Sequence, residues 1–223
     1  MTRVLARFTA LFLLLASTAA VFARDASIDP WETEIARFEA ADRAAPPPPG
    51  GVVFVGSSSI RLWSTLADDF AGTRVLNRGF GGSRIADATR LAARIVLPYR
   101  PRLVVLYAGD NDLAEGRTPP QVLADVEAFI ASVHHDAPTT PVVFVSIKPS
   151  PARAALLPAM REANALVRAY AGRTRGVRYV DVFEPMLGAD GAPRAELFGP
   201  DRLHMNARGY ALWTRIIAPE LRR

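Results

Sequence analysis

One of the three histidines in the chain stands where it could act as a general base. His204 lies three residues after Asp201, shortly before a predicted helix. A carboxylate at this distance can meet the imidazole across one turn, fix its tautomer and stabilise the imidazolium that forms on proton transfer. The alternative is that Asp201 only caps a turn and that His204 is a surface residue. His134 and His135 end another predicted helix, where interaction with the helix dipole is enough to explain them.

A run of three serines, residues 57–59, could supply the hydroxyl that such a base activates. The run follows an apolar segment and precedes a helical pattern, so a hydroxyl here would lie at the edge of a sheet, beside a helix N-terminus. Capping of that helix would also explain the serines. Serine, histidine and carboxylate together would perform nucleophilic acyl transfer.

Two further segments could stabilise the oxyanion that acyl transfer generates. Gly81 and Gly82 leave the backbone N–H groups open to close approach because no side chain intervenes. Asn111 can offer its side-chain amide, and the loss of one such donor typically costs ~3 kcal/mol in the transition state. A tight turn at the glycines and an Asx-turn at Asn111 are the structural alternatives.

Several other chemistries fit the sequence poorly. The chain has no Gly-Lys-Ser or Gly-Lys-Thr, and its glycines do not form a dinucleotide-binding pattern. It has no cysteine and only one well-placed histidine, so a zinc site is not expected. Its basic residues are scattered rather than clustered, which argues against a nucleic-acid partner. We therefore expect no cofactor and no metal. Lys148, Arg61 and Arg84 are interpreted as surface cations whose stems pack on the protein.

The elements that would position these residues alternate along the chain. Apolar runs without polar alternation predict strands at 52–55, 75–76, 103–107, 142–147 and 177–182. Helical patterns between them predict helices at 85–96, 120–134, 151–170 and 206–221. This alternation favours an α/β fold, a three-layer α/β/α sandwich with a mostly parallel five-stranded sheet. Ligands bind beyond the carboxyl ends of such strands, so the polar segments should meet there.

The first 51 residues precede this pattern. Arg3, Arg7 and the uncharged stretch 8–23 predict a secretory signal peptide over residues 1–23, cleaved after Ala23. A transmembrane anchor would need ~20 apolar residues. Residues 24–51 are expected to form a helical arm, capped by Asp29 with Pro30 at its first position, and a proline-rich connector. We interpret the arm as a packing element without a substrate role. Residues 52–223 would be the hydrolase domain.

Four blocks, in this order, resemble the SGNH or GDSL-type hydrolase family. They are Gly-Ser-Ser-Ser-Ile-Arg-Leu-Trp at 56–63, Asn-Arg-Gly-Phe-Gly-Gly at 77–82, Gly-Asp-Asn-Asp at 109–112 and Asp-Arg-Leu-His at 201–204. The resemblance implies Ser58 as nucleophile, Asp201 and His204 as its partners, and Gly82 and Asn111 as oxyanion donors. It also implies the three-layer, flavodoxin-like fold. Ser57 departs from the family, which commonly has aspartate there. The first block is similar to a secreted group likened to platelet-activating-factor acetylhydrolase.

The sequence therefore predicts an exported, periplasmic or secreted serine esterase. Short loops after the first three strands indicate an open cleft rather than a deep tunnel. We therefore expect substrates with short acyl groups. A carbohydrate O-acetyl esterase acting on cell-wall or plant polysaccharide is one alternative, and a non-catalytic binding module on the same scaffold is another. The expected partner is a small-molecule or polysaccharide ester, without stable membrane insertion after signal cleavage. The oligomeric state stays open.

Overall fold

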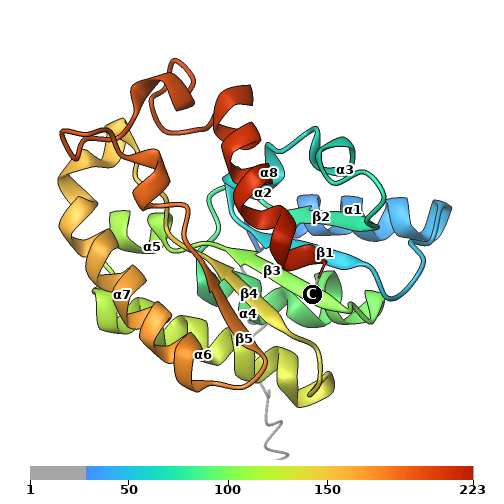
Figure 1. Ribbon diagram of the computed structural model, residues 1–223. Coiled ribbons are helices and arrows are strands. Elements are labelled where there is room, and N and C mark those ends of the chain that lie inside the picture. Colours follow the sequence, from blue (N-terminus) through green and yellow to red (C-terminus); the bar gives the residue numbers. More distant parts are fainter. Residues whose placement is uncertain (1–28, 223) are drawn as a thin grey trace, which may run out of the picture.

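The computed structural model describes residues 29–222, and the sheet at its centre is parallel throughout. The strand order is β2-β1-β3-β4-β5 (Figure 1). The strands are β1 (Val52–Gly56), β2 (Val75–Gly79), β3 (Leu103–Tyr107), β4 (Val142–Val145) and β5 (Val177–Val180). The first strand, β1, thus lies inside the sheet. The second strand is added on one side of it, and the last three strands extend the sheet on the other side. The carboxyl ends of β1 and β3 lie at the point where this direction reverses, a usual position for a ligand site.

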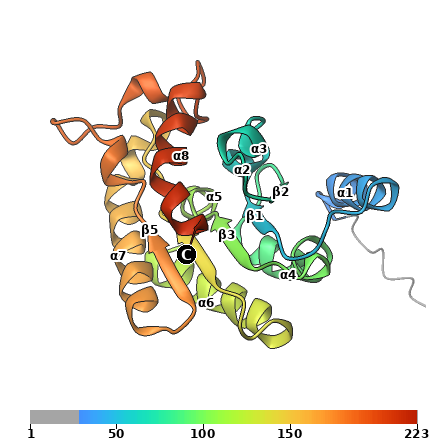
Figure 2. The same ribbon diagram turned by 45° about the vertical axis from the view of Figure 1, so that its right-hand side comes forward.

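Helices cover both faces of the sheet. On one face are α2 (Ser58–Arg61), α3 (Leu66–Asp69) and α8 (Ala207–Leu221). On the other are α4 (Ile85–Ile95), α6 (Pro119–Asp136) and α7 (Leu157–Arg173). The short helix α5 (Asp110–Ala114) follows β3, and α1 (Glu32–Ala44) packs outside the second layer, beside α4 (Figure 2). Four 3-10 helices complete the described elements: η1 (Leu97–Tyr99), η2 (Pro151–Leu156), η3 (Glu184–Met186) and η4 (Ala195–Leu197).

The uninterrupted apolar runs reflect a sheet that is buried on both faces. In β1, Val53 and Val55 point into the core under α4, α6 and α7, whereas Val52 and Phe54 point toward α2, α3 and α8. Because successive side chains of a strand alternate between faces, both sets must be apolar when both faces are covered. The predicted three-layer α/β fold is confirmed.

Apart from shifts of a few residues at the ends of strands and helices, two features differ from the sequence-based expectation. Helix α1 begins at Glu32 with Trp31 at the N-cap, so the expected cap at Asp29 is wrong. Asp29 instead closes the turn just before the helix, where its carboxylate accepts a hydrogen bond from the Trp31 N–H at 3.1 Å. The helix expected at 151–170 is divided into the 3-10 segment η2, inside which Arg153 has a non-helical backbone, and α7, which begins at Leu157.

Residues 1–28 lie outside the described part of the chain, and with them the predicted signal peptide and its cleavage site. Within residues 29–222, no helix combines the length and the apolar character needed to cross a bilayer. The boundaries proposed for the arm, the connector and the domain stay predictions.

Candidate active site

The polar segments that follow β1, β2 and β3 meet with the loop before α8. One pocket of about 630 Å3 is lined by residues from all of them, including Ser58, Gly82, Asn111 and His204. Asp201 stands beside His204 in the same loop. The structure thus brings together all five residues singled out in the sequence.

Ser58 is placed by a glycine that no other residue could replace. Gly56 ends β1 with a φ of +132°, and a Cβ atom there would lie 1.8 Å from the carbonyl oxygen of Tyr107. The chain can therefore turn sharply off the sheet into α2, which begins at Ser58. Ser57 and Ser59 are buried at 1% exposure each, whereas Ser58 is half-buried and lines the pocket. As the first residue of α2, Ser58 has an N–H without a partner inside the helix.

His204 connects the serine to the carboxylate. Its Nε2 lies 3.0 Å from the Ser58 hydroxyl oxygen, and its Nδ1 lies 2.5 Å from a carboxylate oxygen of Asp201. Hydrogen bonds from the Leu203 backbone N–H, the His204 ring and the His204 backbone N–H lower the pKa of Asp201 to about 2. An ionised carboxylate only accepts hydrogen bonds, so Nδ1 must carry the proton and Nε2 presents its lone pair to Ser58.

The loop that carries His204 is a tight hairpin. Phe198 and Met205 form an antiparallel bridge, and the Gly199 N–H donates to the His204 carbonyl at 2.8 Å. Asn206 caps α8 by accepting from two backbone N–H groups, while its amide donates to two carbonyls of the preceding segment. The backbone of the histidine is thus held on both sides, which limits the directions its ring can take.

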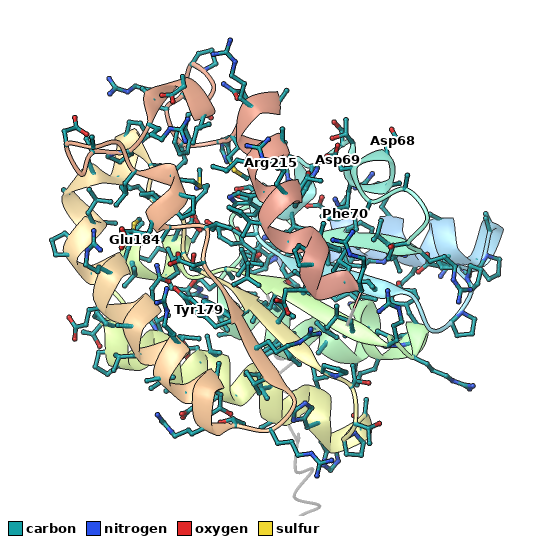
Figure 3. The ribbon with its side chains drawn as sticks, in the orientation of Figure 1. Asp68, Asp69, Phe70, Tyr179, Glu184 and Arg215 are labelled. Carbon is teal, nitrogen blue, oxygen red and sulfur yellow. The ribbon has the colours of Figure 1, made fainter. Side chains whose placement is uncertain are left out.

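Aromatic packing fixes α8 against the helix that carries Ser58. The Tyr210 hydroxyl donates to the Ser59 carbonyl oxygen at 3.0 Å, and the Tyr210 ring lies 5.1 Å from the ring of Trp63. Trp63 is buried in the core, and its indole N–H donates to Asp69, the last residue of α3, at 2.6 Å. Asp69 and Phe70, which follows α3, are labelled in Figure 3. Since Tyr210 lies on the helix that directly follows the His204 loop, this packing sets the distance between histidine and serine.

The amide of Asn111 is oriented by both of its neighbours. Its Nδ2 donates to the Ser83 carbonyl at 3.0 Å, and its Oδ1 accepts from the Arg153 guanidinium at 2.9 Å. Because an arginine has only donors, the oxygen of Asn111 must face Arg153 and the NH2 group must face the glycine turn. One amide hydrogen stays available for a ligand in the pocket.

A buried charge cluster lies beneath Asn111. The Asp110 carboxylate accepts from Lys148 at 3.1 Å and pairs with Arg153 at 3.2 Å. Burial raises the pKa of Asp110, but the two cations outweigh it and hold that pKa below the ordinary value. The expectation that Lys148 is a surface cation is wrong, since it is 1% exposed. Two cations around one carboxylate leave a positive excess, which favours negative charge developing nearby.

The segment that supplies Lys148 and Arg153 is held by an asparagine of α7. Asn164 accepts from the Ile147 N–H at 2.8 Å and donates to the Ile147 carbonyl at 2.9 Å. This pair of hydrogen bonds replaces the lost strand partner where β4 ends. It therefore fixes the direction in which the chain continues toward Arg153.

Asp112 links the asparagine loop to the glycine turn. Its Oδ1 accepts a hydrogen bond from the Ile85 N–H, at the start of α4, at 3.1 Å. This hydrogen bond joins the loop that carries Asp112 to a different element, α4. Burial, opposed in part by this hydrogen bond, raises the pKa of Asp112 to about 6. Asn111 and Asp112 together tether residues 83–85 and so fix the position of the neighbouring Gly82.

The raised pKa of Asp112 predicts a pH dependence of stability. The protonated carboxyl is favoured by folding, so its contribution is fully present below pH 3.8 and is lost as the pH rises through about 6. Asp112→Asn mimics the protonated form at every pH. We expect the stability of the native protein, relative to this variant, to fall by roughly 3 kcal/mol between pH 4 and pH 7. Urea unfolding of both proteins at several pH values measures this difference in the free energy of unfolding.

The control for this titration is Asp68→Asn, at an exposed carboxyl of α3. This variant removes the same carboxylate charge from an exposed position, so an effect of net charge alone would appear equally in both variants. A difference between native protein and Asp112→Asn that stays constant from pH 4 to pH 7 would contradict the assignment.

Sequence reasoning missed one side of the pocket. Pro30, Trp31 and Glu34 of the N-terminal segment line it, together with Arg61 of α2. The Trp31 indole N–H donates to the Gly81 carbonyl at 2.7 Å. The helical spacing of Trp31 with other apolar residues indicated packing, and nothing in that spacing indicates which loop the indole meets.

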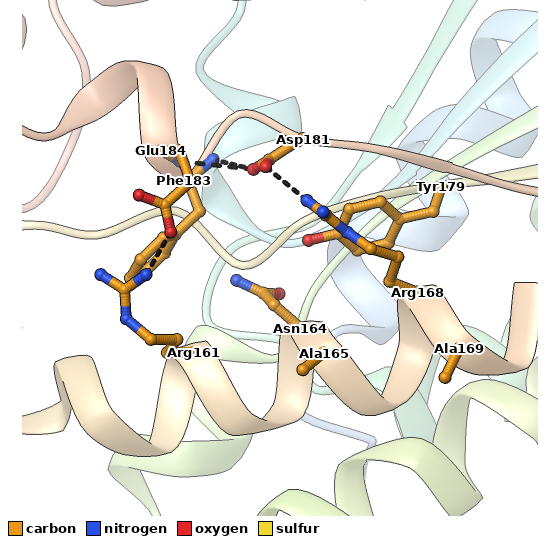
Figure 4. A pocket seen from close by; sticks show the side chains of 9 residues that line it. All are labelled: Arg161, Asn164, Ala165, Arg168, Ala169, Tyr179, Asp181, Phe183 and Glu184. Atoms are coloured by element: carbon orange, nitrogen blue, oxygen red, sulfur yellow. Dashed lines mark hydrogen bonds and ion pairs between the residues drawn. The ribbon is translucent and has the colours of Figure 1, made fainter.

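A second pocket, of about 320 Å3, lies between α7 and β5 and shares no lining residue with the first (Figure 4). Its charged side chains pair with each other: Arg161 with Glu184, and Arg168 with Asp181. Asn164 is engaged with Ile147. This pocket therefore presents few unpaired groups for chemistry. Across residues 29–222, no three or more His, Asp or Glu side chains are grouped so that they could hold a metal ion.

The arrangement at the sheet edge defines a class of proteins. A three-layer α/β fold with a serine and a histidine in contact beside a glycine turn and an asparagine amide is the architecture of SGNH-type hydrolases. The chain belongs to the GDSL-like lipase/acylhydrolase family, whose sequence pattern matches residues 51–212. No functionally curated protein matches the sequence.

Solved structures share this fold at low sequence identity. A protein from Streptococcus pneumonia, assigned as a platelet activating factor, superposes with a TM-score of 0.75 at 20% identity, over 85% of this chain and 92% of that one. A protein from Bacteroides fragilis assigned as an acylhydrolase gives 0.73 at 23% identity, over 83% and 95%. A GDSL-like lipase from Bacteroides thetaiotaomicron gives 0.71 at 22% identity, over 84% and 97%.

Proposed function

We propose that the protein is a serine esterase that hydrolyses carboxylic esters with short acyl groups. The observation that carries the proposal is the contact of the His204 ring with both the Ser58 hydroxyl and the Asp201 carboxylate. The family membership supports ester hydrolysis as the reaction. The two contacts of His204 support the assignment of Ser58 as the nucleophile, His204 as the general base and Asp201 as the carboxylate that orients the histidine.

The proposed reaction has two half-reactions through an acyl-enzyme. His204 Nε2 accepts the hydroxyl proton as Ser58 Oγ attacks the ester carbonyl. The tetrahedral oxyanion is stabilised by the N–H groups of Ser58 and Gly82 and by the amide of Asn111. The imidazolium then protonates the leaving alcohol, and the C–O bond breaks. Water, deprotonated by the same histidine, attacks the acyl-enzyme and releases the acid and the serine.

The test is covalent labelling followed by a substrate series. A fluorophosphonate should modify the folded protein once, on the peptide that contains Ser58, and should leave heat-denatured protein unmodified. Nitrophenyl esters from acetate to octanoate should then show the highest kcat/KM at the shortest acyl chains, because the pocket is open and does not enclose a long acyl chain. Binding of esters without labelling or hydrolysis would favour the non-catalytic binding module.

A polysaccharide O-acetyl ester is the second candidate substrate. The lining of the pocket favours it, because it combines an aromatic residue, Trp31, with three charged side chains that could bond a hydroxyl-rich alcohol part, those of Glu34, Arg61 and Arg153. Release of acetate from acetylated polysaccharide, compared at equal enzyme concentration with nitrophenyl acetate, separates the two substrates. Export to the periplasm or the medium is part of this proposal, and it is supported by the signal-like pattern of residues 1–23.

Asn111→Ala should lower kcat by ~10²-fold or more while KM for nitrophenyl acetate changes little. The variant removes a donor that acts on the oxyanion, while the tether from Asp112 to α4 is retained. Steady-state kinetics on the purified variant measure both constants. Asn111→Asp is the matched comparison: it keeps the size but places acceptors near the oxyanion, so its kcat should be lower still. Turnover near the native rate in either variant would remove Asn111 from the oxyanion hole.

A further inference from the structure

We infer that Trp31 positions the oxyanion donor Gly82, an inference that rests on the proposed function. The indole Nε1 donates a 2.7 Å hydrogen bond to the carbonyl oxygen of Gly81. That carbonyl and the Gly82 N–H belong to one peptide group, which is planar and trans. The direction of the carbonyl therefore fixes the direction of the N–H, which points away from the indole.

The glycine turn needs such a support. Gly81 and Gly82 are adjacent, and two glycines in sequence give the backbone more conformational freedom than any other pair. Gly82 has a φ of +75°, and no atom lies within 4 Å of the position that a Cβ atom would take. No packing contact therefore holds the turn on the side to which a Gly82 side chain would point.

A second contact from the same helix holds the other side of Gly81. The carboxylate of Glu34 accepts from the Gly81 N–H at 3.4 Å, and the Trp31 ring meets the Phe80 ring edge-on at 5.8 Å. Trp31, the N-cap of α1, and Glu34, in its first turn, are three positions apart and lie on the same side of the start of the helix. Together they hold the two peptide groups that flank Gly81.

Helix α1 is itself fixed along its length. Its start is held by an ion pair between Asp29 and Arg90, and its end by Asp42, which bonds the buried Arg78 at 2.5 Å. Between them, Arg94 pairs with Glu32 at 2.6 Å and with Glu39 at 2.7 Å. These contacts hold the indole in place. The family pattern begins at residue 51, so α1 is an addition to the part of the chain that it matches.

The hydrogen bond from Trp31 therefore orients the Gly82 N–H group and makes it a stronger hydrogen-bond donor. A hydrogen bond to one end of a peptide group strengthens donation from the other end, by ~10–30%. A donor already aimed at the oxyanion also needs no reorientation during the reaction. Trp31 therefore acts through Gly82, as a positioning residue, on the transition state rather than on the bound ester.

The test is Trp31→Phe, which keeps an aromatic ring next to Phe80 and removes the indole N–H together with the five-membered part of the ring. In the full chain, kcat for nitrophenyl acetate should fall by roughly 5- to 20-fold, less than for loss of an oxyanion donor itself. KM, the pH profile and the thermal midpoint should change little. The inhibition constant of a trifluoromethyl ketone, which forms a tetrahedral oxyanion on the serine, should rise by the same factor as kcat falls. Inhibition by acetate should not change.

Glu39→Gln is the matched control, since it weakens the attachment of α1 to Arg94 without touching Gly81. Its kcat should stay within twofold of the native value. An equal loss in both variants, or an unchanged ketone affinity in Trp31→Phe, overturns the positioning role. Ser58→Ala, assayed in parallel, separates the two proposals: if it is inactive while Trp31→Phe is fully active, only the positioning role fails. If the native protein hydrolyses no ester, both fail.

Discussion

Ser58→Ala is expected to reduce ester hydrolysis to the uncatalysed background. Removal of the nucleophile of a serine hydrolase typically lowers kcat by roughly 10⁴- to 10⁶-fold, because binding and oxyanion contacts alone recover only a small part of the acceleration. The hydroxyl of Ser58 lies 3.0 Å from Nε2 of His204, the distance of a hydrogen bond along which a proton can pass. The measurement is release of nitrophenol from the acetate ester, and the variant should also resist fluorophosphonate labelling.

The two neighbouring serines provide the matched controls. Ser57→Ala and Ser59→Ala remove the same group from the same turn, but both side chains are buried away from the pocket. We expect these variants to keep kcat within a few-fold of the native value. If either of them lost activity while Ser58→Ala retained it, the nucleophile would have to be reassigned.

The strand pattern predicted the sheet and the edge at which the polar segments meet, for a simple reason. Strands buried on both faces are uninterrupted apolar runs, and such runs are visible in a sequence. The glycine that closely follows such a run therefore marks the carboxyl end of a strand. Gly56 and Gly109 mark two such ends, and the segments that follow them contain Ser58 and Asn111.

The choice among the three serines could not be made from residue type. Serines 57, 58 and 59 offer the same hydroxyl, and only the turn at Gly56 decides which of them leaves the core. The resemblance to the family selected Ser58, and the structure places that hydroxyl against His204. A role in catalysis stays a prediction until the variants above are measured.

Long-range side-chain contacts were beyond the reach of the sequence. Asp112 bonds a helix that starts 27 residues before it, and Trp31 bonds a turn 50 residues after it. Lys148 was interpreted as exposed because lysine is seldom buried. In the structure it is buried, because its ammonium group forms an ion pair with the buried carboxylate of Asp110. None of these pairings has a local spacing that a periodic pattern would reveal.

Asp201→Asn is expected to lower kcat by ~10³- to 10⁴-fold while the protein stays folded, because the loss arises from the tautomer of His204. The carboxylate requires a proton on Nδ1 and so leaves Nε2 as the acceptor for Ser58. An asparagine amide can donate to Nδ1 instead, which places the ring proton on Nε2, where it opposes proton transfer. The amide of this variant would keep an oxygen for the backbone N–H groups of Leu203 and His204, so the hairpin should persist.

The pH dependence of kcat distinguishes a change in the His204 tautomer from the loss of the Asp201 charge alone. The pKa of Asp201 is lowered to about 2, chiefly by the Leu203 N–H and the His204 ring, so the carboxylate stays ionised throughout the working range. Protonation of Asp201 therefore cannot produce an acid limb of the native pH–rate profile within that range. In Asp201→Asn, activity should rise with hydroxide concentration at high pH, since hydroxide can take the proton that Nε2 no longer accepts. A variant as active as the native protein at neutral pH would show that the ring is oriented without Asp201.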